Sequence, residues 1–362
     1  MPGNYCLTML FSLLFSCVLL EQAEELFEPV DTSTTTDGDT AAPTDTAAPT
    51  DTAPPSDSAD TGAPVDSGDS ASPEDSGDSG DTGGPPPQTR GIWAWQDSGD
   101  PYGTLAVVGD GTAEDDMVAD LVSWGVARVY GSYGNRPISE PEVIADWNVK
   151  LHAAGIESHV LLGEPDDISS REWAALEEKI QERLLEYNDS RTDPLERFDG
   201  LHLDIEPQAL SEWSGLDEAG KYAYLGLLAD TYEFVEDVMD FAGSALPVRA
   251  DLAVWFDKLP PPLGGTGSVG WPATGDRDDW FGTLAVDGVS MMAYERDDLL
   301  DIEGDVADEG LLFPGELRVG LNEEVGTTWL DIDEMFDMAE LLEADGYAVD
   351  LHSYSKIRAQ FP

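Results

Sequence analysis

The sequence has 362 residues, with 75 acidic residues against 17 basic ones and a formal net charge of −58. A surface this acidic repels phosphate groups, which argues against nucleic acid and anionic membranes as partners. Composition changes near Arg90: all 17 basic residues lie from Arg90 onward, and 17 acids precede it. The C-terminal part therefore keeps 58 acids against 17 bases, a net charge of −41.

Residues 1–22 have the composition of an export signal. Leu7 to Leu20 form an apolar run of signal-peptide length, too short for a transmembrane helix. Within it, Leu-Phe-Ser-Cys at residues 14–17 resembles the lipobox of bacterial lipoproteins. That resemblance implies an acylated Cys17 as the first mature residue, so that the protein meets a membrane only through this anchor. The alternative is an ordinary cleaved signal with an incidental Cys17. We expect an extracellular or cell-surface protein, and an outer-membrane lipoprotein if Cys17 is acylated.

Residues 23–89 have the composition of a disordered linker. They contain no Lys or Arg, and Asp, Thr, Ser, Ala, Pro and Gly make up nearly all of residues 31–87. Such a segment cannot bury enough apolar surface to offset its chain entropy. Both cysteines, Cys6 and Cys17, precede it. Disulfides, thiol catalysis and cysteine-ligated zinc are therefore excluded for the part that follows.

Residues 90–362 have the pattern of an α/β protein with a (β/α)8 TIM barrel, because short apolar runs alternate with amphipathic stretches. The expected strands are Gly91 to Trp95, Ala127 to Tyr130, Ile156 to Leu162, Gly200 to Ile205, Val248 to Trp255, Gly288 to Tyr294, Leu317 to Leu321 and Tyr347 to His352. The clearest expected helices are Asp115 to Trp124, Glu140 to Ala154, Ser170 to Tyr187, Glu218 to Phe241 and Asp331 to Asp345. Residues 297–314 fit a sixth helix poorly, and only a stub, 356–362, follows the last strand.

Aromatic and polar side chains come at the predicted C-terminal ends of several strands. The loops of a barrel converge there on one mouth, where catalytic residues of this fold lie. Aromatic rings beside polar groups are typical of sugar-binding clefts, although any single ring is also explained by packing. The candidate substrate-binding residues are Trp95, Tyr130, His202, Trp255, His352 and Tyr354.

The most informative stretch is residues 199–207, Asp-Gly-Leu-His-Leu-Asp-Ile-Glu-Pro. Strand alternation places His202, Asp204 and Glu206 on the interior face of the barrel and the three aliphatic residues between them toward the helices. Three titratable groups in line are expected to raise the pKa of at least one carboxyl by desolvation and like-charge repulsion.

A glycosidase requires this condition, since one carboxyl donates a proton while a second stays ionised. We therefore predict Glu206 as the general acid and Asp204 as its partner. The structural alternative is an Asp that caps a strand end and a Glu206 held by a barrel arginine such as Arg249 or Arg318.

Residues 199–206 resemble the Asp-Gly-x-Asp-x-Asp-x-Glu signature of family 18 glycoside hydrolases, the chitinases and their relatives. Residues 292–295, Met-Ala-Tyr-Glu, resemble the Met-x-Tyr-Asp of their sixth strand. The resemblance implies that Glu206 is the acid, that Asp204 orients the acetamido group of the substrate and that Tyr294 supports that group. His202 and Ile205 depart from the signature.

Glu206-Pro207 also resembles the Asn-Glu-Pro of retaining hydrolases of the large barrel clan, whose nucleophile is a Glu that ends strand seven. That resemblance implies Glu324 as the nucleophile, with Glu323 as the alternative if the strand end twists. The substrate-assisted and enzyme-nucleophile mechanisms both stay open. In both, Glu206 is the proton donor of a retaining enzyme.

The predicted function is an exported O-glycosyl hydrolase that cleaves a polysaccharide or oligosaccharide. The alternative is a catalytically inactive barrel that binds glycan at the cell surface. The four histidines show no metal-binding spacing, and no phosphate-binding loop or serine nucleophile elbow occurs. We therefore expect no metal and no cofactor, and a carbohydrate as the partner of a monomer.

Overall fold

The computed structural model describes residues 88–361, except residue 98 and residues 257–277. The expected signal segment with Cys17, and all but the last two residues of the expected linker, lie outside the described residues. The domain boundaries in that part of the chain therefore stay predictions.

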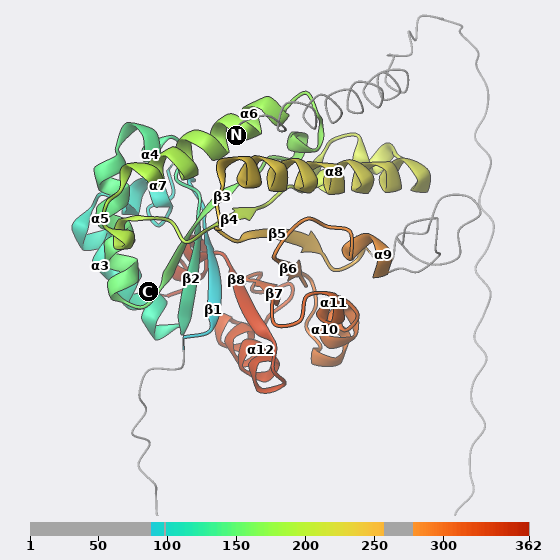
Figure 1. Ribbon diagram of the computed structural model, residues 1–362. Helices are drawn as coiled ribbons and strands as arrows, with labels where there is room; N and C mark the ends of the chain where they lie inside the picture. Colours follow the sequence, from blue (N-terminus) through green and yellow to red (C-terminus); the bar gives the residue numbers. More distant parts are fainter. Residues whose placement is uncertain (1–87, 98, 257–277, 362) are drawn as a thin grey trace, which may run out of the picture. The chain divides into compact units, whose positions relative to one another are not determined.

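Eight parallel strands of the described chain close into a barrel in sequence order, with β1 paired to both β2 and β8. Helices surround the strands, with α8 and α12 on the outside (Figure 1). The expected (β/α)8 barrel is confirmed. The strands are β1 (Arg90–Ala94), β2 (Val126–Gly131), β3 (Glu157–Leu162), β4 (Gly200–Leu203), β5 (Val248–Ala253), β6 (Gly288–Met292), β7 (Leu317–Asn322) and β8 (Ala348–His352).

The longer helices coincide with the five expected from sequence periodicity. The third expected helix, Ser170 to Tyr187, is one helical stretch that a π-helical turn, η2, divides into α6 and α7. These elements are α3 (Gly111–Ser123), α5 (Pro141–Ala153), α6 (Trp173–Ile180), η2 (Gln181–Leu185), α7 (Glu186–Ser190), α8 (Glu218–Ala242) and α12 (Ile332–Ala344).

Local sequence fixes the ends of α8. The Asp217 side chain caps its N-terminus by accepting a hydrogen bond from the Gly220 backbone at 2.8 Å. Gly243 ends the helix in the left-handed conformation, with φ 69°. None of the helices in the described part of the chain is long and apolar enough to cross a membrane.

Short helices fill the remaining connections. The stretch that fitted a sixth helix poorly, residues 297–314, forms two short helices, α10 and α11, and the stub after β8 forms α13. The short elements are α2 (Thr104–Val107), α4 (Arg136–Ser139), η1 (Pro165–Ile168), η3 (Pro194–Glu196), η4 (Pro207–Ala209), η5 (Trp213–Gly215), α9 (Asp278–Phe281), α10 (Leu299–Val306), α11 (Glu309–Leu312) and α13 (Tyr354–Arg358).

The apolar core lies between the barrel and the helices. On β4, Leu201 and Leu203 are fully buried in this core together with residues of α8 such as Leu225 and Leu228. The intervening His202 is fully buried on the opposite face, inside the barrel, where its ring stacks on that of Tyr130. The alternation expected from the sequence is therefore the alternation that the strand has.

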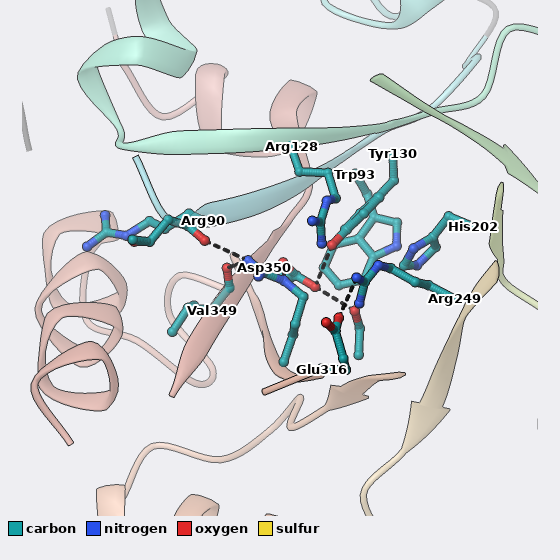
Figure 2. Close-up of polar contacts among 12 residues, drawn as sticks. Arg90, Trp93, Arg128, Tyr130, His202, Arg249, Glu316, Val349 and Asp350 are labelled. Carbon is teal, nitrogen blue, oxygen red and sulfur yellow. Dashed lines mark hydrogen bonds and ion pairs between the residues drawn. The ribbon is translucent and has the colours of Figure 1, made fainter. Parts of the chain in front are cut away.

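The barrel interior is polar, and Asp350 of β8 is its most connected carboxylate. Arg318 Nε donates to Asp350 Oδ1, and Ser290 Oγ and Tyr130 Oη donate to Asp350 Oδ2. Burial raises the pKa of Asp350, but Arg318 and these hydrogen bonds outweigh that effect and hold the pKa below its ordinary value. Figure 2 shows that the Arg128 and Arg249 side chains lie in the same interior region.

Gly91 of β1 makes room for this cluster. A Cβ atom at Gly91 would lie 2.1 Å from Asp350 Oδ1 and 2.8 Å from the Tyr130 hydroxyl oxygen. Neither group can retreat freely, because Asp350 is fully buried and paired with Arg318.

We predict that Gly91→Ala lowers the free energy of unfolding by about 1–3 kcal/mol, the usual cost of an overpacked interior. Urea denaturation followed by circular dichroism measures the effect. Gly304→Ala is the matched control, because Gly304 lies exposed in α10 with open space around it. In a helix interior this change should stabilise the protein by about 0.5–1 kcal/mol. An unchanged urea midpoint for Gly91→Ala would contradict the close approach to Asp350.

Candidate active site

The carboxylates Asp204 and Glu206 lie just beyond the end of β4, at the C-terminal mouth of the barrel. The Asp204 backbone N–H donates to the Leu162 carbonyl at 2.9 Å, which holds this segment against the end of β3. The approach requires Gly163, since a Cβ there would lie 2.4 Å from the Asp204 carbonyl oxygen and its φ is 129°. The ends of β3 and β4 thereby form one wall of the mouth.

Both carboxylates line a cavity of about 270 Å³ at this wall. Side chains from the ends of β1 to β4 surround it, including Trp95, Gln96, Ser132, Glu164, Asp204 and Glu206. The cavity therefore brings the two predicted catalytic carboxylates together with one of the predicted aromatic contacts, Trp95.

Asp204 has no ion pair with an arginine or lysine in the described part of the chain. Burial raises its pKa well above the ordinary value, and the negative charges of Asp251, Glu206 and Glu164 raise it further. Its Oδ1 atom is shielded from solvent and has no hydrogen-bond partner among the described residues. An unpaired buried carboxylate oxygen favours the protonated form of Asp204.

Glu206 is half-buried, and burial raises its pKa, while His352 and a hydrogen bond from Gln208 act in the opposite direction. Gln208 Nε2 donates to Glu206 Oε2 at 2.6 Å. The structural alternative, an arginine that holds Glu206, does not occur in the described part of the chain. Arg249 pairs with Glu316 and Arg318 with Asp350.

Beneath the mouth lies a buried polar layer. His202 Nε2 shares a hydrogen bond of 2.8 Å with Asp251 Oδ1, and Trp93 Nε1 donates to Asp251 Oδ2 at 2.9 Å. Burial lowers the pKa of His202 to about 3, so its imidazole is neutral. Burial also raises the pKa of Asp251 well above its ordinary value. His202 and Tyr130 are fully buried, and neither lines the cavity. Figure 2 shows their rings side by side in the barrel interior.

On the other side of the mouth, His352 connects β1, β7 and β8. Trp95 Nε1 donates to His352 Nε2 at 3.2 Å, and His352 Nδ1 lies 3.2 Å from Glu323 Oε2. An indole N–H only donates, so Nε2 accepts the hydrogen bond from Trp95, and Nδ1 is the ring nitrogen that faces Glu323. The Tyr294 ring lies 5.3 Å from the His352 ring.

Tyr294 lies within the field of the site carboxylates. Burial raises the pKa of Tyr294 well above its ordinary value, and the negative charges of Asp251, Asp204 and Glu206 raise it further. The phenol is therefore neutral and able to donate a hydrogen bond into the mouth. The structure thus brings Asp204, Glu206, Tyr294, His352 and Trp95 to the same end of the barrel.

Three other predicted residues do not line this cavity. Tyr354 is buried in the helical layer, where its hydroxyl donates to Asp120 at 3.1 Å and its ring lies 5.7 Å from that of Trp124. Trp255, after β5, packs beside Trp213. Glu324 is exposed in the turn after β7 and accepts a hydrogen bond from the Thr327 hydroxyl at 3.1 Å.

Sequence reasoning did not find several members of the site. Asp251 could have been found by the same alternation that identified Asp204, since it shares the interior face of β5 with Arg249. Glu164 and Gln208 follow strand ends in loops, where no periodic pattern signals which way a side chain points. Tyr232 lies fully buried on α8, and its raised pKa reflects burial and the charges of Asp251 and Asp204.

The barrel is similar to solved structures of low sequence identity. One is a chitinase from Bacteroides thetaiotaomicron, 10% identical, with 74% of this chain and 89% of that chain covered and a TM-score of 0.44. Another is the PgaB (BpsB) glycoside hydrolase domain from Bordetella bronchiseptica, which is 11% identical. The match covers 76% of this chain and 96% of that chain, with a TM-score of 0.44. A sugar phosphate isomerase/epimerase from Parabacteroides distasonis ATCC 8503 is 12% identical. The match covers 74% of this chain and 94% of that chain, with a TM-score of 0.41. No protein-family model and no curated protein sequence matches the chain. At this level the similarity concerns the fold and not the chemistry at the mouth.

The raised pKa of Asp204 predicts that this residue lowers stability at neutral pH. Its folded pKa exceeds the unfolded value of about 3.9, so the folded state loses stability as the pH rises from that value through the folded pKa. Asp204→Asn should therefore raise the free energy of unfolding at pH 7, and the gain should shrink as the pH falls toward 4. Urea denaturation at both pH values tests this.

The control for that experiment is Asp337→Asn, because Asp337 lies exposed on α12. It should change the free energy of unfolding by no more than about 0.5 kcal/mol. A destabilised Asp204→Asn variant at pH 7 would show that Asp204 serves the fold and not the site.

Proposed function

We propose that the protein is an exported glycoside hydrolase that cleaves a polysaccharide or oligosaccharide, with Glu206 as the proton donor. The observation that carries the proposal is the placement of Asp204 and Glu206 on the wall of one cavity, at the C-terminal mouth of a TIM barrel, with both pKa values raised. Catalytic groups of this fold lie at this end of the strands.

The two carboxylates suit glycosidic bond cleavage. The bond breaks when one carboxylic acid protonates the leaving oxygen while negative charge stabilises the oxocarbenium-like sugar. Desolvation keeps Glu206 protonated to a higher pH than an exposed glutamate, so it can donate. The two carboxyls also influence each other, because the negative charge of Glu206 raises the pKa of Asp204.

The two possible mechanisms differ in whether an acid at the end of β7 acts as the nucleophile. If the enzyme supplies its own nucleophile, we assign that role to Glu323, whose side chain is 14% exposed and contacts His352 at the mouth. Glu324 faces solvent in the following turn. If instead the substrate supplies the nucleophile, Asp204 orients that group and Tyr294 donates to it. Retention of the anomeric configuration is part of the proposal in both cases.

Export and location rest on the sequence. The apolar run from Leu7 to Leu20 and the Leu-Phe-Ser-Cys stretch ending at Cys17 support a protein tethered to, or released from, the cell surface. The acidic linker would then act as a spacer between Cys17 and the barrel. A glycan outside the cell is the substrate that this arrangement fits.

We predict that Glu206→Gln lowers kcat/KM by about 10²–10⁴-fold, the usual contribution of a general acid. The assay is release of reducing sugar from a panel of polysaccharides that includes chitin, with exposed Glu340→Gln as the control. In the wild type, kcat/KM should fall as the pH rises through the raised pKa of Glu206, since only the protonated form donates. Equal binding of a glycan by wild type and Glu206→Gln, with no cleavage by either, would instead favour the inactive glycan-binding barrel.

A second pair of variants separates the mechanisms. With an enzyme nucleophile, Glu323→Gln should lose activity as strongly as Glu206→Gln, whereas Glu324→Gln should stay within about twofold of wild type because its side chain lies in solvent. The same reducing-sugar assay measures both. A Glu323→Gln variant that keeps its activity would exclude Glu323 as the nucleophile and leave the substrate-assisted route with Asp204.

A further inference from the structure

Beside the cavity at Glu206 lies a second compartment of about 340 Å³. The two share the wall made by the ends of β2 and β3, including Ser132, Gly163 and Glu164. The far side of the second compartment is formed by Lys179 and Arg183, from α6 and the π-helical turn η2. A ligand that reaches Glu206 in the first compartment therefore extends toward two cationic side chains in the second.

Arg183 differs from the arginines inside the barrel. Arg128, Arg249 and Arg318 each pair with a carboxylate, namely Glu157, Glu316 and Asp350. No hydrogen bond or ion pair joins the half-buried Arg183 guanidinium to another of the described residues, although the net charge of the sequence is −58. Burial lowers the pKa of Arg183, while Glu182 and Glu164 act against this from a distance. A partly desolvated guanidinium without a counterion is an attractive position for an anion.

Lys179 adds to this cationic wall and is anchored by the protein. Its Nζ lies 3.5 Å from Asp167 Oδ2, and Asp167 also accepts the Glu164 backbone N–H at 2.9 Å. This link fixes Lys179 to the loop after β3. Asp167 neutralises part of the Lys179 charge, so Arg183 is the main unpaired cation of the compartment.

The backbone at Arg183 is also unusual. Residues Gln181–Leu185 form a π-helical turn between α6 and α7. Such turns are rare and occur frequently at functional sites, because the wider turn changes the direction of the side chains that it carries. Here the turn packs beside α4 and presents Arg183 to the cavity.

We propose that the second compartment binds an anionic substituent of the glycan, a uronic acid carboxylate or a sulfate ester, and that Arg183 is the residue that selects acidic polysaccharides. The inference rests on the proposed function, because it extends the site at Glu206. The charges along the cleft also set the orientation: an anionic group is attracted to Arg183 and repelled by Glu164 and Asp204. The acidic substituent therefore lies away from the carboxylates that act on the bond.

The test is cleavage of alginate, polygalacturonate, hyaluronan and chondroitin sulfate, of carboxyl-reduced polygalacturonate and hyaluronan, and of neutral chitin and mannan, by the full chain. Arg183→Met should lose at least tenfold in kcat/KM on the acidic polymer that the wild type cleaves, mainly through KM, and Arg183→Lys should lose less. On the carboxyl-reduced polymer, wild type and Arg183→Met should be equal if the group is a carboxylate. Loss only on chondroitin sulfate would assign a sulfate.

The matched control is Arg171→Met, an exposed arginine near the start of α6, which should behave as wild type. Thermal unfolding of each variant shows whether it is folded. The inference is overturned if the wild type cleaves neutral polymers only, or if Arg183→Met and Arg171→Met cleave the acidic polymer equally. Either result leaves the glycosidase itself intact.

If the wild type cleaves no polymer, the proposed function fails and binding decides the inference separately. Isothermal titration of the same polymers at low ionic strength should then show binding of an acidic polymer that Arg183→Met loses and Arg171→Met keeps. Equal binding by both variants, or no binding at all, would overturn the anionic subsite.

Discussion

The ion pair between Arg318 and Asp350 is the interaction on which the rest of the barrel interior depends. A buried charge is tolerated only when it is paired, and Arg318 Nε donates directly to Asp350 while its Nη2 binds two backbone carbonyls. The interior arginines lie near the N-terminal ends of their strands and are committed to carboxylates there. Among the described residues, no arginine or lysine pairs with Asp204 or Asp251 closer to the mouth, and burial raises their pKa values while that of Asp350 is held low. The raised carboxyl pKa values at one end of the barrel thus contrast with the paired charges at the other.

The layer between these two ends contains a neutral imidazole. His202 is neutral at physiological pH, since burial lowers its pKa to about 3. It therefore adds no positive charge that would ionise Asp204 or Asp251, and it also adds no third negative charge where the family 18 signature has an Asp. The departure of His202 from that signature fits an interior in which Asp251 already supplies the buried carboxylate of this layer. Trp93 and Tyr130 complete the layer: Trp93 donates a hydrogen bond to Asp251, and Tyr130 donates one to Asp350.

The sequence predicted the eight strands because each is a short apolar run with period-two alternation between helical stretches, and Asp204 and Glu206 followed from that alternation. The sequence could not show which of two neighbouring residues at a strand end faces the mouth, because that depends on the local twist of the strand. Whether Glu323 or Glu324 faces the mouth depends on where β7 stops, and a one-residue change reverses the answer. Tyr130 and Tyr354 showed the same limit, because an aromatic ring at a strand end suits the mouth, the barrel interior and the helical layer equally well. Arg183 had no signal at all, since a π-helical turn preserves the helical composition around it and its position depends on tertiary packing.

The position of Arg183 would also reconcile an acidic protein with the acidic substrate that we propose. Charges in solvent are screened beyond about 8 Å at physiological ionic strength, so most of the surface acids act weakly on a ligand inside the cleft. Charges that line the cavity are screened much less, and there the balance is set by Lys179 and Arg183 against Glu164 and the carboxylates at β4. The overall charge of the chain therefore does not decide which glycan binds. A single arginine placed in the cleft by the π-helical turn outweighs many acids on the outer surface, because it acts at contact distance and in a partly desolvated site.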